Sequence, residues 1–154
     1  MTPQDLQAEI KEFLNEVTED ISLKDIDGKE TILQIFNQNL PKRNTDEDDP
    51  YPYCIVRLIN GSSNAVEDEE NGIRVLLIFG IVNQDMQNRG HEDILGIINR
   101  IILRLSENNV LKTFYQTGKI EWVLDDEDTY PYFFGGMDLT FAPAFIPRRE
   151  EMFL

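Results

Sequence analysis

The sequence contains a single cysteine and a single histidine among its 154 residues. One cysteine forms no disulfide within the chain, and Cys54 stands in an apolar, strand-like stretch that predicts a small buried side chain without a metal-binding or redox role. With His91 as the only histidine, one chain supplies neither a multi-histidine metal site nor a histidine-activated nucleophile. These two shortages argue against the commonest catalytic and metal-binding sites, and a reducing cytoplasm fits the cysteine usage.

Basic residues are also scarce, with 14 against 29 acidic ones, and the formal net charge is −15. A charge of this sign repels phosphate backbones and anionic membrane surfaces, so we expect no specific nucleic-acid binding and no membrane partner. No apolar run is long enough to span a membrane, and the first residues lack the basic and apolar regions of a signal peptide. Length and composition predict one globular domain with a core of its own.

The acidic residues gather in three clusters between apolar segments, where loops are expected. The first two clusters consist of Asp46, Glu47, Asp48 and Asp49, and of Glu67, Asp68, Glu69 and Glu70; the third spans Asp125 to Asp128. Solvated loop tips are the simplest interpretation, and a shared acidic surface is the alternative. Carboxylates could bind a divalent ion, but the spacing of these clusters is unspecific, so we expect no metal, no cofactor and no catalytic residues.

The other reactive groups of the sequence also suggest no catalytic site. His91, followed by two carboxylates, is interpreted as a residue at the start of a helix, because neighbours in a first helical turn point in different directions. No serine has a nucleophile-elbow context, and no glycine spacing forms a phosphate loop. Gly135-Gly136 is interpreted as a turn or bulge.

The strongest structural signal is a helix from Gly90 to Asn109. Its apolar residues recur at the spacing of one helical face: Ile94, Leu95, Ile97, Ile98, Ile101, Ile102 and Leu105. A first helix is expected from Pro3 to Val17, with the capping-box spacing at Thr2 and Asp5. A short third helix is expected around Val110 to Tyr115, ending at Gly118.

Strand patterns fill much of the rest. They are expected at Thr31–Leu40, Tyr53–Asn60, Ile73–Val82, Ile120–Leu124 and Met137–Phe141, with polar loops at 41–52 and 61–72. The second and third of these strands predict one antiparallel hairpin and the last two predict another, with Tyr130–Gly136 in or beside its connection. The order of elements predicts an α+β domain with a mainly antiparallel sheet, on which one long helix and one or two shorter helices pack.

The strand Ile73–Val82 is apolar on both faces. Val75, Leu77, Phe79 and Ile81 share one face, and Leu76, Ile78 and Val82 share the other. The long helix covers one face, and either another subunit or the remaining elements of the same chain must cover the second. We therefore take Leu76 and Ile78 as candidate subunit-interface residues, together with Phe153 in the apolar end Met152-Phe153-Leu154.

Four segments in this order resemble the tail terminator, or tail-completion, proteins of long-tailed bacteriophages and prophages. They are DDPYPYCIVRLINGSS, GIRVLLIFGIVNQD, NRGHEDILGIINRI and KIEWVLDDEDTYPYFFGGMDLTF. The resemblance covers about Ile32 to Arg149.

This resemblance implies a virion structural protein without enzymatic activity and with a small α+β fold. Such proteins form a homo-oligomeric ring, usually a hexamer, at the head-proximal end of the tail tube, where the ring ends tube polymerisation and takes part in head-tail joining. The implied partners are further copies of the chain, the tail tube protein and a head-completion protein, and the implied location is the virion tail, after assembly in the host cytoplasm. An acidic lumen would let DNA pass through the ring, and the loops at 46–49 and 67–70 are candidates for that lining or for assembly contacts.

Two other functions stay open on the sequence alone. One is a head-completion (connector) ring protein, a close relative in role. The other is a small acidic inhibitor that mimics the charge of DNA, which explains the net charge but gives the two-faced strand no purpose.

Overall fold

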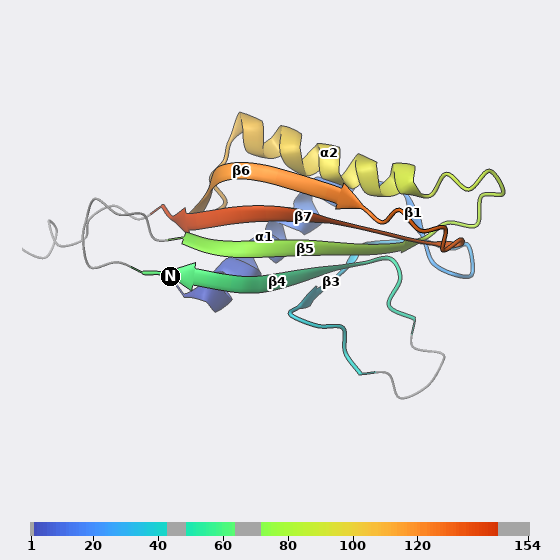
Figure 1. Cartoon of the computed structure of the whole chain (residues 1–154), viewed down its shortest axis with the longest axis horizontal. Helices are drawn as coiled ribbons and strands as arrows, with labels where there is room; N and C mark the ends of the chain where they lie inside the picture. The colour runs from blue at the N-terminus through green and yellow to red at the C-terminus, as the bar shows by residue number, and fades with distance from the viewer. Residues whose placement is uncertain (1, 43–48, 64–71, 145–154) are drawn as a thin grey trace, which may run out of the picture.

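The structure is a computed structural model, and it describes residues 2–42, 49–63 and 72–144. Figure 1 shows a long, twisted sheet with the two helices of the described chain. The elements in chain order are α1 (Pro3–Thr18), β1 (Leu23–Lys24), β2 (Glu30–Thr31), β3 (Gln34–Asn37), β4 (Tyr53–Ser62), β5 (Gly72–Val82), α2 (His91–Glu107), β6 (Phe114–Leu124) and β7 (Tyr132–Pro143). The α+β class with a mainly antiparallel sheet is confirmed.

The main sheet has the strand order β3-β4-β5-β7-β6, and β1 pairs with β2 in a small separate ribbon. Every neighbouring pair in the main sheet is antiparallel except β3 and β4, which run parallel. Both predicted hairpins are present, as β4–β5 and β6–β7. The central strand β5 is therefore paired on both sides from Ile73 to Gly80.

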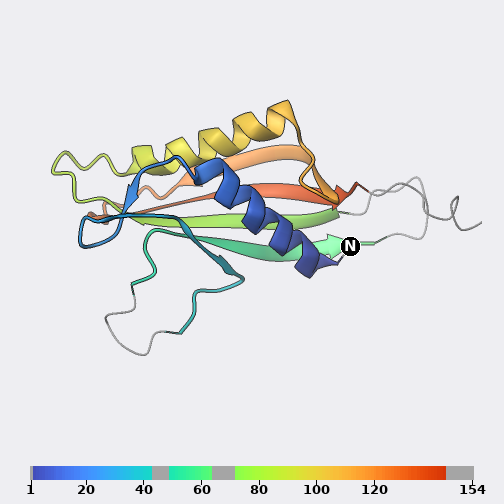
Figure 2. The same cartoon turned by 180° about the vertical axis from the view of Figure 1, so that it is seen from behind.

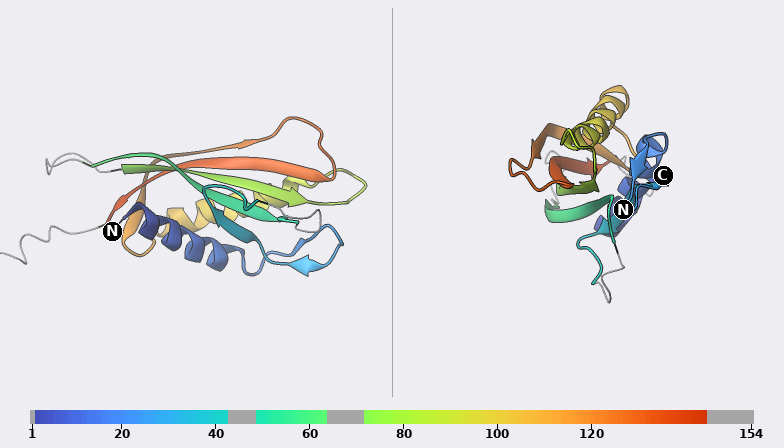
Figure 3. Two further views of the ribbon diagram at one scale, coloured as in Figure 1. Left: turned by 90° about the horizontal axis from the view of Figure 1, so that it is seen from below. Right: turned by 90° about the vertical axis from the view of Figure 1, so that its right-hand side faces the viewer.

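Both helices pack on the same face of this sheet (Figures 2 and 3). α1 begins with the expected capping box, in which Thr2 Oγ1 accepts from the Asp5 N–H at 3.1 Å and Asp5 Oδ2 accepts from the Thr2 N–H at 2.9 Å. α2 buries the predicted stripe against the sheet. Its buried members are Ile94, Ile97, Ile98, Ile101 and Leu105. The apolar layer between the helices and the sheet is the core of the protein.

The core face of β5 is the one predicted, with Val75, Leu77, Phe79 and Ile81 buried. α1 is tied to the far end of the sheet by Glu9, whose carboxylate accepts the N–H groups of Lys112 and Thr113 at 3.1 and 2.8 Å and also the Thr113 hydroxyl. A buried charge is tolerated here because three donors satisfy it.

The predicted short helix at 110–115 is wrong. Val110 forms an isolated bridge with Tyr115, and the chain enters β6 at Phe114. Phe114 and Gln116 are both buried, so the effective period in this stretch is two residues and not three or four. Gly118 has a positive φ of 75° at an irregularity in the β6–β7 pairing, where it serves a bulge and not a helix end.

Two predicted strands have different bounds. The stretch 31–40 contains only the two-residue β2 and the four-residue β3, with Leu33 buried between them and Ile32 exposed. β7 begins at Tyr132, so most of the stretch 130–136 that was expected near the connection belongs to the strand. Gly135 and Gly136 lie inside β7, opposite Phe79 and Ile78 of β5.

Candidate functional site

The candidate site lies on the face of the main sheet opposite the two helices, which we call the open face (Figure 3). No helix among the described residues covers it. Side chains of paired residues point to the same side of a sheet, so the register identifies the residues of this face. Its middle row, from edge to edge, is Phe36, Ile55, Ile78, Gly136 and Val123.

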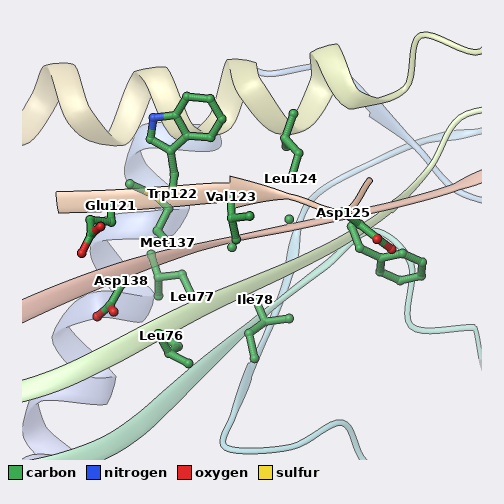
Figure 4. Close-up of a pocket in the computed structure, with 13 residues that line it drawn as sticks. Leu76, Leu77, Ile78, Glu121, Trp122, Val123, Leu124, Asp125, Met137 and Asp138 are labelled. Carbon is green, nitrogen blue, oxygen red and sulfur yellow. The ribbon is translucent and has the colours of Figure 1, made fainter. Parts of the chain in front are cut away.

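A groove of about 550 Å³ runs across this row at its β7–β6 end. Gly136 has no side chain to fill the space between Ile78 and Val123, which produces the hollow. Figure 4 shows Val123 pointing away from α2, whereas its neighbours Trp122 and Leu124 point toward the helix side. Leu76 and Ile78 are half-buried and Val123 is 66% exposed, so the groove presents apolar carbon to solvent.

Charged residues border the groove on one side. The Arg74 guanidinium donates to both carboxylate oxygens of Asp138, with a shortest distance of 2.7 Å. The hydrogen bonds from Arg74 lower the pKa of the Asp138 carboxyl, and those to Asp138 raise the pKa of Arg74. Glu121 is the β6 neighbour of Asp138 in the same row. The border is therefore acidic toward β6 and carries one ion pair toward β5.

Aromatic side chains border the other side, where the chain enters β4 and β7. Tyr51 packs against Tyr53, Tyr132 and Phe134, with ring centroids 5.1, 4.7 and 6.2 Å apart. Burial, followed by the neighbouring tyrosines and Asp49, raises the pKa of Tyr51 to about 12. Tyr51 and Tyr53 flank a cis proline, as do Tyr130 and Tyr132. The four-ring cluster joins two strands that are not neighbours in the sheet.

The residues with reactive side chains lie elsewhere. His91 is the exposed first residue of α2, as predicted, and the next ionisable residue facing inward is Asp93, which accepts from Asn83 at 2.9 Å. Burial raises the pKa of the Asp93 carboxyl and that of the Cys54 thiol. Cys54 is fully buried on the core face of β4, which confirms the small buried side chain.

A second, polar hollow near the end of β5 contains three aspartates. Asp25 accepts from the N–H groups of Asp27 and Lys29, Asp85 pairs with Arg89, and Asp93 bonds Asn83. Each of these carboxylates already has a partner, which is a turn N–H group, an arginine or an asparagine side chain. Within residues 2–42, 49–63 and 72–144, no cluster of histidine, cysteine, aspartate and glutamate has the arrangement of a metal site.

The structure brings together part of the predicted site. Leu76 and Ile78 do line one groove. Phe153 and the acidic residues 46–48 and 67–70 lie outside the described residues. Asp49 caps the start of the next strand by accepting from the Tyr51 N–H at 3.0 Å, and Asp125 to Asp128 form the exposed β6–β7 turn.

Sequence reasoning missed Val123 and Gly136 as parts of this groove. Val123 lies between Trp122 and Leu124, which are also apolar, so the sequence pattern gives no reason to single it out. Gly136 was interpreted as a turn or bulge. The paired Tyr-Pro-Tyr stretches at 51–53 and 130–132 were the visible signal for the aromatic cluster, because both stand immediately before or at the start of strands.

In comparisons with known proteins, no protein-family model and no curated protein sequence matches the chain. No helix in the described part of the chain is long and apolar enough to cross a membrane.

Proposed function

We propose that the protein is a structural subunit of a bacteriophage tail that forms a ring at the head-proximal end of the tail tube, and that the open face is one of its assembly surfaces. The observation that carries this proposal is the groove lined by Leu76, Ile78 and Val123, on a sheet face that no helix of the described residues covers. Exposed apolar surface of this kind is stabilised when a partner removes it from water.

The fold supports the same function. A tail terminator-like protein is expected to be a small α+β domain with helices beside a sheet, and the described chain has that architecture. Both helices are on one face, so the other face is free to contact a neighbouring subunit. The chain thus supplies from its own residues an apolar strip with charged and aromatic borders, which is the usual anatomy of a protein interface.

The net negative charge of the chain is consistent with a ring through which DNA passes. Six copies of a chain with net charge −15 carry about −90 formal charges, and an acidic lumen repels passing DNA. Asp125 to Asp128, at the exposed β6–β7 turn, are the described acidic cluster that such a lumen would include. A mapped ring whose lumen excludes every acidic cluster would contradict this part of the proposal.

The test is the molar mass in solution, measured by light scattering with and without the candidate tail tube protein from the same genome neighbourhood. We expect a ring of several copies, either alone or with the tube protein, because some ring subunits assemble only on their template. A monomer under both conditions contradicts the ring.

The two other functions predict different results. A head-completion ring would assemble but would not bind or shorten tail tubes. An acidic DNA mimic would stay monomeric and would inhibit a nuclease in competition with DNA.

A further inference from the structure

We propose that the groove on the open face binds residues 145–154 of a neighbouring copy, with Phe153 in the space over Gly136. This inference rests on the proposed ring and names one contact that would join its subunits. The occupant is a segment of this chain that follows the last described residue, Ala144, and its sequence is FIPRREEMFL.

The shape of the groove favours a large side chain. Ile78 and Val123 stand on either side of Gly136, and a Cβ built on the glycine would meet no side chain there but only the Leu77 carbonyl oxygen, at 3.1 Å, so the hollow has two apolar walls and a backbone floor. A phenylalanine ring in this space would cover the exposed carbon of Val123 and the half-buried side chain of Ile78. The segment offers Phe153 between Met152 and Leu154, which are also apolar.

The charges also match. The charged residues that line the groove are Glu121, Asp125 and Asp138. Asp138 pairs with Arg74 at 2.7 Å, and Glu121 makes a longer, exposed ion pair with Lys119 of β6 at 3.6 Å, so the lining carries a net negative charge. Arg148 and Arg149 lie five and four residues before Phe153, a span of about 13–17 Å in an extended chain. Glu121 and Asp125 lie two positions before and after Val123, about 7 Å along an extended chain, so both carboxylates are within the reach of these arginines from a Phe153 ring beside Val123.

The position of the segment favours a second copy. β7 ends at Pro143, seven residues beyond Gly136, so the chain leaves its sheet about 23 Å from the centre of the groove. To enter its own groove, the segment would have to reverse at once and return over that distance. A segment that continues in the direction of β7 leads away from its own sheet and reaches another copy without a reversal. Pro147 has no N–H, which favours docking by side chains over addition as a strand.

The test is cysteine cross-linking between full-length chains. A Val123→Cys chain is mixed with a Phe153→Cys chain under mild oxidation, and the products are separated without reducing agent. We expect a disulfide-linked dimer of the two variants, because Cys54 is fully buried and does not compete. A Val123→Cys/Phe153→Cys double variant should give a ladder of linked copies.

Three results overturn the inference. They are the absence of the mixed dimer, a double variant that forms only an internal disulfide, and a Val123→Cys chain that links mainly to itself. The matched control is Met86→Cys mixed with Phe153→Cys, since Met86 is 88% exposed but outside the groove. Equal cross-linking of this control also overturns the inference.

A charge exchange adds a second readout. Arg149→Glu in the Phe153→Cys chain should lower the yield of the mixed dimer by up to about fivefold, as expected for one exposed ion pair. Glu121→Arg in the Val123→Cys chain should restore the yield. Mass measured on the same samples separates the two proposals: rings without the cross-link reject only the bound segment, whereas monomers in every sample reject the ring.

Discussion

Gly80 and Tyr53 are partners across β5 and β4 on the open face, and the tyrosine ring lies directly over the glycine. A Cβ atom built on Gly80 would lie 2.3 Å from Cζ of Tyr53, far inside van der Waals contact. The glycine is therefore required by its neighbour and not by its own backbone. The same ring contacts Tyr51. The lack of a side chain at Gly80 therefore leaves the space that the Tyr53 ring occupies at the aromatic border of the groove.

Replacing Gly80 with alanine should lower the free energy of unfolding by about 1–3 kcal/mol, because the added methyl group forces the Tyr53 ring to move. Gly96→Ala is the control: it lies inside α2 with no atom within 4 Å of the new Cβ, and it should stabilise the protein by about 0.5–1 kcal/mol. Urea unfolding of both variants gives the two values. Equal effects of the two substitutions would show that Tyr53 does not need the glycine.

Tyr51 should make stability depend on pH in the alkaline range. Its folded-state pKa is raised to about 12 from the ordinary tyrosine value of 10.0, so the unfolded chain loses this proton first. Its contribution is complete below pH 10, and the free energy of unfolding should fall as the pH rises from 10 to about 12. Tyr51→Phe should weaken that fall and remove the last step of the tyrosinate absorbance titration. An unchanged titration would contradict the assignment.

At the scale of elements, the period of the apolar residues decided which predictions succeeded. α2 has seven apolar residues at helical spacing, and the structure buries five of them. The stretch at 110–115 had only four such residues, which predicted a short helix, and the structure has a bridge and the start of β6 there. The conformation of this stretch depends on Glu9 of α1, whose carboxylate accepts hydrogen bonds from the backbone N–H groups of Lys112 and Thr113. Such a contact, between residues a hundred positions apart, leaves no local signal.

Ile98→Asp should unfold the protein, because it places a carboxylate without a partner in the core between α2 and the sheet. Ile98 has an exposed fraction of 0%, and we expect a loss of more than about 4 kcal/mol. Leu103→Asp on the same helix is the matched control, since Leu103 is 57% exposed and its substitution should cost less than about 1 kcal/mol. Circular dichroism and thermal unfolding of the pair measure the difference. A folded Ile98→Asp chain would show that this helix face is not core.

At the scale of the whole molecule, the sequence predicted the fold class and the two faces of β5, but only half of the candidate site. Leu76 and Ile78 could be found because they break the alternation of a half-buried strand. Val123 and Gly136 could not, because their importance depends on the order β5-β7-β6, which places the last hairpin beside β5. Strand order is set by contacts between distant residues, and no single segment encodes it.

The central claim is that the open face joins subunits while the opposite face forms the core. The most direct measurement is the molar mass by light scattering of wild type, Ile78→Glu and Val123→Glu, each with the tail tube protein present. The account predicts a ring for wild type, of about 107 kDa if six chains of 17.9 kDa assemble. Both variants should stay folded, as judged by circular dichroism, and should remain monomers of 17.9 kDa. Val123→Glu is the control for misfolding, because Val123 is already exposed and a charge there should leave the monomer folded. Folded variants that form the same ring as wild type would contradict the account.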